Sequence, residues 1–208
     1  MNEVSRETPP PPLAAEVFSD RLNLAIVYAR NLATSGVERG LIGPREVPRL
    51  WERHLLNCAV VAQRVPQGAS VADVGSGAGL PGLVWAISRP DLTVTLIDPL
   101  LRRVTFLQEM CEELGLLDQV RVIRGRADQI HETFAVVTAR AVAPLGKLGA
   151  WCMPLVREGG VFLALKGSNA HEELAASHKE LSLHGGKNML VTTYGDLEIP
   201  TTVVEVSK

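Results

Sequence analysis

The spacing of apolar residues along the chain changes at Gly68. Before this point, apolar residues recur every three or four positions over residues 13–33 and again over 47–65, as they do on one face of a helix. A glycine-rich stretch, 36–44, separates the two segments. We therefore predict that residues 13–68 form a helical extension ahead of the rest of the chain.

After Gly68, short apolar runs alternate with helical patterns. The runs predict strands over residues 70–74, 93–97, 120–123, 134–138 and 161–165. The helical patterns that follow them cover residues 80–88, 101–114, 145–156 and 170–183. Two more apolar runs, 188–193 and 201–206, have no helix between them. Because parallel strands need a crossover connection, residues 69–208 should form a mostly parallel seven-stranded sheet with an antiparallel C-terminal pair, in a single compact unit with the extension.

The composition is that of an ordinary globular protein. Of the 208 residues, 46% are hydrophobic and 21% are charged. Residues 1–12 contain four consecutive prolines and no secretion signal, so we expect a disordered tail on a cytoplasmic protein without a membrane partner. Cys58, Cys111 and Cys152 form no CxxC pair, so we expect buried thiols, no disulfide and no metal site.

A glycine-rich loop, Gly75 to Gly79, follows the first predicted strand. Ligands of open α/β sheets bind at the carboxyl ends of the strands, and glycine lets the backbone approach them closely. The loop fits two fingerprints in overlapping registers, the GxGxG of methyltransferases and, from Gly77 to Gly82, the GxGxxG of dinucleotide enzymes. Asp73 favours the first, because its carboxylate suits an ammonium and a sulfonium and would repel a pyrophosphate. We therefore expect the class I (Rossmann-like) methyltransferase fold with S-adenosylmethionine as cofactor.

Other candidate ligand contacts lie at the ends of later strands. Asp98 ends the second predicted strand, where a carboxylate can accept both ribose hydroxyls or simply cap the next helix. Residues 126–128 follow the third strand, where such enzymes contact the adenine edge. Arg140 is the polar group that ends the fourth strand, and its alternative role is a buried salt bridge.

The helical extension is locally basic although the net charge of the chain is −2. Residues 39–64 carry five arginines and two glutamates, and two of these arginines are one helical turn apart. A phosphate backbone responds to such a local potential. The candidate RNA-binding residues are Arg49, Arg53, His54, Arg102, Arg103 and Lys166. The alternative for each is a solvated surface charge.

Several segments together resemble the ribosomal small-subunit methyltransferase G family (RsmG, also called GidB). They are residues 73–82, 98–107, 140–145 and 165–167, with 19–24 and 52–57 in the extension. The Gly-Leu-Pro-Gly ending at Gly82 and the Arg-Ala-Val-Ala beginning at Arg140 are unusual among methyltransferases. The resemblance runs from about Asp20 to Val206. It departs from the family pattern at Pro99-Leu100, where many members have small polar residues.

The resemblance implies methylation of N7 of a guanine in 16S ribosomal RNA, with the small subunit as partner. It also implies a set of cofactor contacts, which together with the residues above are Asp73, Gly75, Gly77, Gly79, Leu80, Asp98, Arg126, Ala127, Asp128 and Arg140. Guanine N7 has a free lone pair and no proton, so no general base is required, and Arg140 and Lys166 would act by positioning. We expect Arg53, His54, Arg140 and Lys166 to face one pocket shared by cofactor and RNA.

Three other classes of function remain open from the sequence. The chain could be a small-molecule methyltransferase with the extension as a lid, a cofactor-sensing RNA-binding module without catalysis, or a dinucleotide enzyme. The sequence does not determine the oligomeric state, and we favour a monomer.

Overall fold

A computed structural model describes residues 9–140 and 143–208. Most of the predicted tail, residues 1–12, therefore lies outside the described residues. The first helix, α1 (Pro12–Phe18), begins at the last of the four prolines, where the missing N–H of proline has no helical partner to lose. In the described ranges, no helix combines the length and the apolar character that a membrane crossing requires.

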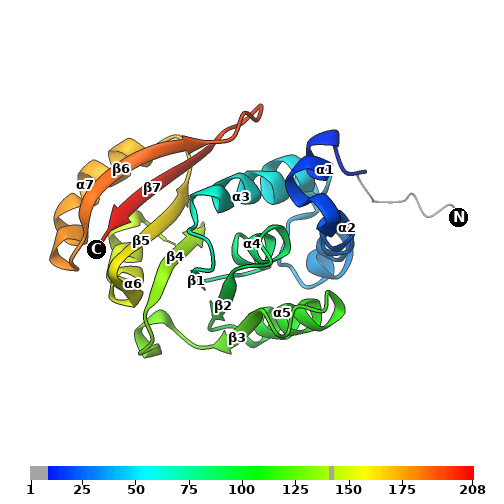
Figure 1. The fold of residues 1–208 in the computed structure, drawn as a ribbon, viewed down its shortest axis with the longest axis horizontal. Helices are drawn as coiled ribbons and strands as arrows, with labels where there is room; N and C mark the ends of the chain where they lie inside the picture. The colour runs from blue at the N-terminus through cyan, green and yellow to red at the C-terminus, as the bar shows by residue number, and fades with distance from the viewer. Residues whose placement is uncertain (1–8, 141–142) are drawn as a thin grey trace, which may run out of the picture.

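Seven strands form one sheet in the order β3-β2-β1-β4-β5-β7-β6 (Figure 1). They are β1 (Ser70–Val74), β2 (Thr93–Asp98), β3 (Val120–Arg124), β4 (Phe134–Arg140), β5 (Val156–Lys166), β6 (Lys187–Tyr194) and β7 (Thr201–Ser207). Neighbours among β1 to β5 pair in parallel, whereas β7 runs antiparallel to both β5 and β6. The predicted sheet with its antiparallel C-terminal pair is confirmed.

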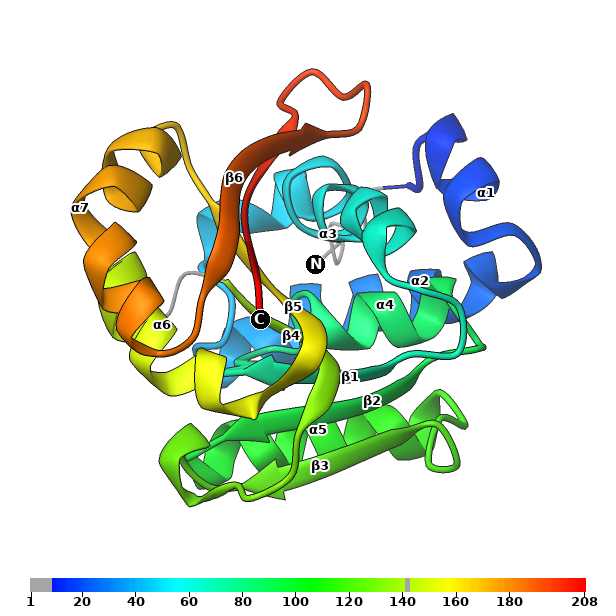
Figure 2. The same cartoon turned by 60° about the vertical axis from the view of Figure 1, so that its left-hand side comes forward.

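Helices cover both faces of this sheet (Figures 1 and 2). One face packs against α2 (Leu22–Asn31), α3 (Asn57–Ala59), α4 (Gly82–Ser88) and α5 (Leu101–Glu113), and the other against α6 (Leu145–Cys152) and α7 (Ala170–Leu183). Strand residues alternate between two apolar cores: Val136 of β4 lies in the first core and its neighbour Val137 in the second.

The second helical segment of the extension is less regular than predicted. We expected a single helix over 47–65, but the chain forms a 3-10 segment (Pro44–Arg49), a π-helical segment (Leu50–Leu56), α3 and a further 3-10 segment (Val60–Arg64). Pro48 is one physical reason, because proline has no N–H to donate and its ring clashes with the preceding turn. The segment is helical as predicted, but it changes between 3-10, π and α hydrogen-bonding patterns along its length.

Strand β5 begins five residues before its predicted start and includes the pair Gly159-Gly160. A Cβ on Gly160 would lie 2.8 Å from the carbonyl oxygen of Ala135. The missing side chain therefore lets the two strands approach closely enough to pair, which a reading of glycine as a strand breaker does not foresee.

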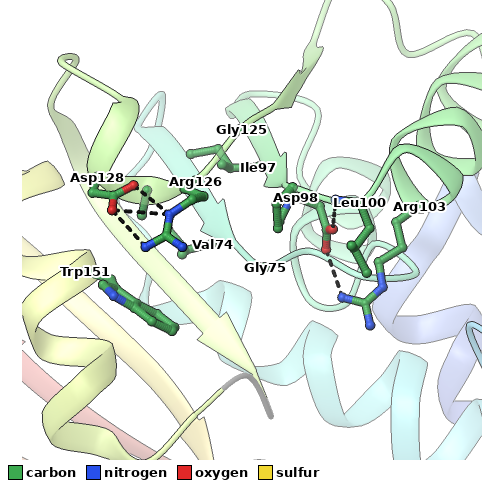
Figure 3. Close-up of a pocket in the computed structure, with 12 residues that line it drawn as sticks. Val74, Gly75, Ile97, Asp98, Leu100, Arg103, Gly125, Arg126, Asp128 and Trp151 are labelled. Carbon is green, nitrogen blue, oxygen red and sulfur yellow. Dashed lines mark hydrogen bonds and ion pairs between the residues drawn. The ribbon is translucent and has the colours of Figure 1, made fainter.

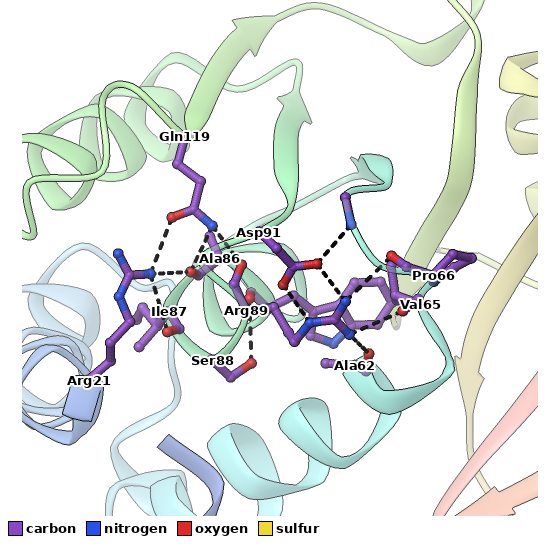
Figure 4. A network of polar contacts seen from close by, with 12 residues as sticks. Arg21, Ala62, Val65, Pro66, Ala86, Ile87, Ser88, Arg89, Asp91 and Gln119 are labelled. Atoms are coloured by element: carbon purple, nitrogen blue, oxygen red, sulfur yellow. Dashed lines mark hydrogen bonds and ion pairs between the residues drawn. The ribbon is translucent and has the colours of Figure 1, made fainter. Parts of the chain in front are cut away.

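A network of polar contacts joins the extension to the sheet domain at the far end of α4 (Figure 4). Arg21 Nη1 donates to the carbonyl of Ala86 at 2.9 Å, and Gln119 donates to the same oxygen at 2.9 Å. Arg89 reaches the other way, donating to the carbonyls of Ala62 at 2.8 Å and Val65 at 3.1 Å. Hydrogen bonds thus connect the extension to the sheet domain on two sides of α4.

The C-terminal hairpin also contacts the extension. Arg64 Nε lies 2.8 Å from Glu205 Oε2, a carboxylate that is nearly fully buried in β7. At the start of the same strand, the Thr201 hydroxyl donates to the carbonyl of Asn57 at 2.7 Å. These contacts place residues near 57 beside residues near 201, although the two segments are far apart in sequence.

Candidate active site

The glycine-rich loop turns the chain away from β1 immediately after Val74. The backbone N–H groups of Gly75 and Ser76 donate to the carbonyl of Ile97 on β2, at 2.8 and 3.2 Å. Gly75 and Gly77 have φ angles of 72° and 60°, in the left-handed region that favours glycine. The loop is therefore held against the end of β2, in the GxGxG register that we predicted.

A cavity of about 270 Å³ opens beside this loop, at the carboxyl ends of β1, β2 and β3 (Figure 3). We call it the first cavity. Its wall includes five predicted cofactor contacts, namely Gly75, Asp98, Arg126, Ala127 and Asp128. Apolar side chains complete the wall, among them Leu100 and the flat indole of Trp151. A flat apolar surface next to a carboxylate suits an adenosine, whose base stacks and whose ribose donates hydrogen bonds.

Asp98 is fully buried and accepts three hydrogen bonds in the first cavity. Its Oδ1 accepts from the N–H of Leu100 at 2.9 Å, and its Oδ2 from the N–H of Gly77 and from Arg103, each at 3.1 Å. The helix-capping and cofactor roles of Asp98 are therefore compatible. Arg103 lies in the cavity wall on this carboxylate, rather than on an outer phosphate-binding rim, whereas Arg102 is exposed.

Arg126 and Asp128 form an exposed ion pair on the opposite side of the first cavity. Arg126 Nη2 lies 2.9 Å from Asp128 Oδ2 and its Nε lies 3.1 Å from Oδ1. The guanidinium lowers the pKa of the Asp128 carboxyl. Both groups are open to solvent, so they can adjust to a ligand with little loss of stability.

Asp73 lies beneath the loop and outside the wall of the first cavity. It is fully buried, and its Oδ2 accepts from the N–H of Gly82 at 3.0 Å. Its Oδ1 is buried and has no hydrogen-bond partner. Burial raises the pKa of this carboxyl to about 7. The structure thus shows Asp73 holding the start of α4, and a direct contact with a ligand ammonium would require the loop to move.

Two other predicted contacts also serve packing. A Cβ on Gly79 would lie 2.9 Å from both Leu83 Cβ and Tyr28 Oη, so this glycine admits α2 and α4 rather than a ligand. Leu80 is buried and does not line the first cavity. The Tyr28 hydroxyl donates to the carbonyl of Ala78 at 2.6 Å, which ties the extension to the glycine-rich loop.

A second cavity, of about 510 Å³, lies at the carboxyl ends of β4 and β5. Three of the predicted cations, Arg53, Arg140 and Lys166, line it together. Asn57 of the extension and Thr201 of the C-terminal hairpin, which are joined by a hydrogen bond, also line this cavity. The shared pocket that we expected is therefore two neighbouring hollows. Arg140, expected at the cofactor, lines the second cavity and not the first.

Arg140 is held by the extension. Its Nη1 lies 3.0 Å from Cys58 Sγ, and its Nη2 donates to the carbonyl of Arg53 at 3.3 Å and lies 2.7 Å from His54 Nδ1. His54 Nε2 in turn lies 2.9 Å from Glu46 Oε2. His54, expected to contact RNA, is only 8% exposed and lies behind Arg140. Burial lowers the pKa of its imidazole, and the Arg140 charge lowers it further.

Lys166 is not the open cation that we expected. Its side chain is 9% exposed, and its Nζ donates to Glu173 Oε2 at 2.7 Å and to the carbonyl of Ala143 at 3.0 Å. The same Glu173 oxygen accepts the N–H of Leu145, which begins α6. Lys166 therefore joins the segment after β4 to α7, because a buried ammonium needs these acceptors.

Arg49 and Arg53 are exposed cations of the extension, and Arg53 Nε lies 3.6 Å from Glu46 Oε2, the oxygen that also contacts His54. Both arginines line a third hollow of about 440 Å³ beside the β6–β7 connection, which also contains the carboxylates Glu52, Asp196 and Glu198. Arg53 is 52% exposed and lines both this hollow and the second cavity.

Several residues of the two cavities and their surroundings, among them Trp151, Cys58, Glu46 and Asn57, were not predicted as site residues from the sequence. Trp151 and Cys58 resemble core residues in a helical pattern, and all three cysteines are indeed buried. Glu46 and Asn57 are single polar residues whose importance depends on contacts distant in sequence. In the described part of the chain, no group of histidine, cysteine and carboxylate side chains is arranged to hold a metal ion.

Comparison with known proteins gives a consistent answer. Residues 21–199 match the family model described as rRNA small subunit methyltransferase G (GidB). A protein named ribosomal RNA small subunit methyltransferase G from Nocardioides sp. (strain ATCC BAA-499 / JS614) is 57% identical, over 99% of this chain and 84% of its own length. A protein of the same name from Salinispora tropica is 53% identical, over 97% of this chain and 88% of its own.

Solved structures show the same fold at much lower identity. The methyltransferase SibL in its apo form superposes with a TM-score of 0.63 at 17% identity, covering 95% of this chain and 70% of that one. Magnesium protoporphyrin IX methyltransferase from Synechocystis PCC 6803, a structure with bound S-adenosylmethionine, gives 0.60 at 15% identity, covering 89% and 97%. The fold is that of class I S-adenosylmethionine-dependent methyltransferases. Together with the family match over most of the chain, it shows that the protein belongs to the rRNA small subunit methyltransferase G family of these enzymes.

Proposed function

We propose that this protein transfers the methyl group of S-adenosylmethionine to N7 of a guanine in 16S ribosomal RNA, acting in the cytoplasm on the small ribosomal subunit. The observation that carries the proposal is the pair of neighbouring cavities at one edge of the sheet. The first offers a buried carboxylate and apolar walls, and the second offers cations. A nucleoside cofactor suits the first, and an RNA base with its phosphates suits the second.

The residues of the first cavity fit the cofactor. The Asp98 carboxylate has four lone-pair positions, and the hydrogen bonds from Gly77, Leu100 and Arg103 occupy three of them. The fourth position can accept one ribose hydroxyl, and a second hydroxyl can bind when Arg103 moves away. The cofactor supplies an electrophilic methyl group when it is bound. The glycines that bend the loop back against β2 leave its backbone open beside the cavity.

The second cavity has to hold a guanine that has left its stack. Arg140 presents a guanidinium whose orientation the extension fixes, and a guanidinium can donate to guanine O6 while it leaves the lone pair of N7 free. Because N7 has a lone pair and no proton, the protein need not remove one, and the site holds the two reactants in line. Such alignment can lower a barrier by about 7–11 kcal/mol.

Transfer of tritium from labelled S-adenosylmethionine tests the proposal, with purified small subunits, free 16S RNA and no RNA compared side by side. We expect incorporation into the RNA, at guanine N7 by chemical cleavage mapping. Incorporation into small molecules only would instead indicate the small-molecule alternative. Cofactor binding without any transfer would support the non-catalytic RNA-binding module.

Arg53→Ala examines the assignment of the second cavity. RNA methylation should fall steeply while the affinity for S-adenosylhomocysteine stays unchanged, because Arg53 does not line the first cavity. Arg121→Ala is the matched control, since Arg121 is 51% exposed, is paired with a glutamate and lines neither cavity. Equal effects of the two changes would contradict the assignment.

A further inference from the structure

Arg140 and Lys166 are the cations that the strands contribute to the second cavity within the described residues, and of these two only Arg140 has its contacts with the extension. Its three acceptors are a sulfur, a carbonyl oxygen and the imidazole Nδ1 of His54, and the last lies nearest, at 2.7 Å. The guanidinium can only donate hydrogen bonds. His54 therefore has to present a lone pair on Nδ1.

This requirement determines the protonation state of His54. With Nδ1 accepting, a neutral imidazole carries its proton on Nε2, and Nε2 lies 2.9 Å from the Glu46 carboxylate that can accept it. A protonated imidazole would donate from both nitrogens. It would then have no acceptor for Arg140 and would place two cations 2.7 Å apart.

We propose that Glu46 and His54 are positioning residues for Arg140, and that methyl transfer requires His54 to be neutral. The inference rests on the proposed function, because it takes the second cavity as the site of the guanine. Glu46 selects the imidazole tautomer, the imidazole holds the guanidinium, and the guanidinium faces the base. A change of the His54 charge is thereby felt at a cavity that His54 itself does not line.

The burial of His54 and the charged groups around it determine the pH at which its imidazole becomes protonated. Burial and the charges of Arg140 and Arg53 lower the pKa of His54, while the hydrogen bond and the charge of Glu46 raise it. The buried Cys58 adds no charge here, because burial raises the pKa of its thiol. Activity should therefore be full at neutral pH and fall on the acidic side, below the usual range of a histidine.

Asp73 is the other buried group that titrates in this region, since burial raises its pKa to about 7. Its charge acts on Arg140 but its hydrogen bond goes to Gly82, so it belongs to a separate contact. A fall in activity caused by protonation of Asp73 would disappear in Asp73→Asn, and its position on the pH scale would be the same in Glu46→Gln as in wild type. The two sources can thus be distinguished by substitution.

The experiment is the pH dependence of kcat and KM for methylation of small subunits by wild type, Glu46→Gln, His54→Asn and Asp73→Asn. Glu46→Gln keeps an acceptor for His54 Nε2 without the charge, so the acidic fall should move to lower pH. His54→Asn puts an amide oxygen that does not titrate in the place of Nδ1, so the fall should vanish. In Asp73→Asn it should persist. Glu132→Gln and His178→Asn, both exposed positions, are the matched controls and should leave the profile unchanged.

His54→Leu removes the acceptor altogether. We expect kcat to drop roughly 10- to 100-fold, the range for losing one hydrogen bond to a charged group, with an unchanged affinity for S-adenosylhomocysteine. His54→Asn should restore most of this loss. Imidazole nitrogen NMR of the wild type should show the Nε2–H tautomer at neutral pH, a reading that needs no activity and no variant.

The proposal is overturned if the acidic fall is the same in Glu46→Gln and His54→Asn as in wild type, or if NMR shows the Nδ1–H tautomer. It is equally overturned if His54→Leu loses activity only in proportion to folded protein, measured by urea unfolding. A wild type that methylates no RNA at any pH would refute the proposed function instead. In that case the tautomer observed by NMR still tests whether His54 Nδ1 accepts a hydrogen bond from Arg140.

Discussion

The strongest test of how the extension shapes the cofactor loop is Gly79→Ala. Gly79 has a φ angle of 99°, which L side chains rarely adopt. An added Cβ would lie 2.9 Å from Leu83 Cβ, 2.9 Å from Tyr28 Oη and 3.1 Å from Leu107 Cδ2. Three elements, α2, α4 and α5, would therefore have to shift to admit one methyl group.

The expected loss of stability has two parts. Overpacking a well-filled core costs about 1–3 kcal/mol, and placing alanine at a positive φ costs about 1–2 kcal/mol. The free energy of unfolding should thus fall by about 2–5 kcal/mol. Gly115→Ala isolates the second part, because Gly115 has a φ of 65° and no atom within 4 Å of the added Cβ.

Urea unfolding followed by tryptophan fluorescence measures both variants. We expect Gly79→Ala to lose about 1–3 kcal/mol more than Gly115→Ala, the overpacking part alone. Gly79→Ala should cost less in a Tyr28→Phe background than in wild type, since Tyr28→Phe removes one of the crowded atoms, and the comparison within that background cancels the lost hydrogen bond to Ala78. If the two glycine variants lose the same free energy, an added Cβ at Gly79 is not crowded and the reasoning is wrong.

Three further outcomes can be checked. Asp98→Asn should weaken S-adenosylhomocysteine binding by roughly 10- to 100-fold in calorimetry, because hydrogen bonds to a charged acceptor are the stronger ones; an unchanged Kd would remove Asp98 from the site. Asp73 has a pKa raised from 3.8 to about 7, so its contribution to stability is full below about pH 4 and is lost as the pH rises through 7. Asp73→Asn should therefore gain stability relative to wild type over that interval, by up to about 4 kcal/mol in urea unfolding, and a constant difference would contradict the assignment. Lys166→Met should lower the free energy of unfolding by about 1–3 kcal/mol, since it leaves the acceptors of Glu173 and Ala143 without the ammonium; an effect on RNA binding alone would restore Lys166 as an open cation.

Most of the sheet could be predicted from the sequence because its signals are local. Strand β1 (Ser70–Val74) and helix α7 (Ala170–Leu183) have the bounds that their apolar spacing predicts. The parallel pairing of the first five strands follows from their alternation with helices. The family resemblance is also confirmed, since residues 21–199 match the family model.

The roles of individual site residues were less predictable, because they depend on partners distant in sequence. Lys166 resembles a free cation until Glu173 and Ala143 are seen beside it. His54 resembles an RNA contact, yet its neighbours Glu46 and Arg140 come from different elements and enclose it. A charged residue at a strand end indicates that a site is near, and only the packing shows whether the charge is open or paired.

The second cavity has a wall built from both ends of the chain. Asn57 and Arg53 come from the extension, while Thr201 and its neighbours come from the start of β7. The residues that line the first cavity all lie between Val74 and Trp151. During synthesis on a ribosome, the residues that line the first cavity are thus complete long before those that line the second. On the proposed assignment, the donor site is synthesised early, and the guanine site is complete only after β7 has emerged and packed against residue 57.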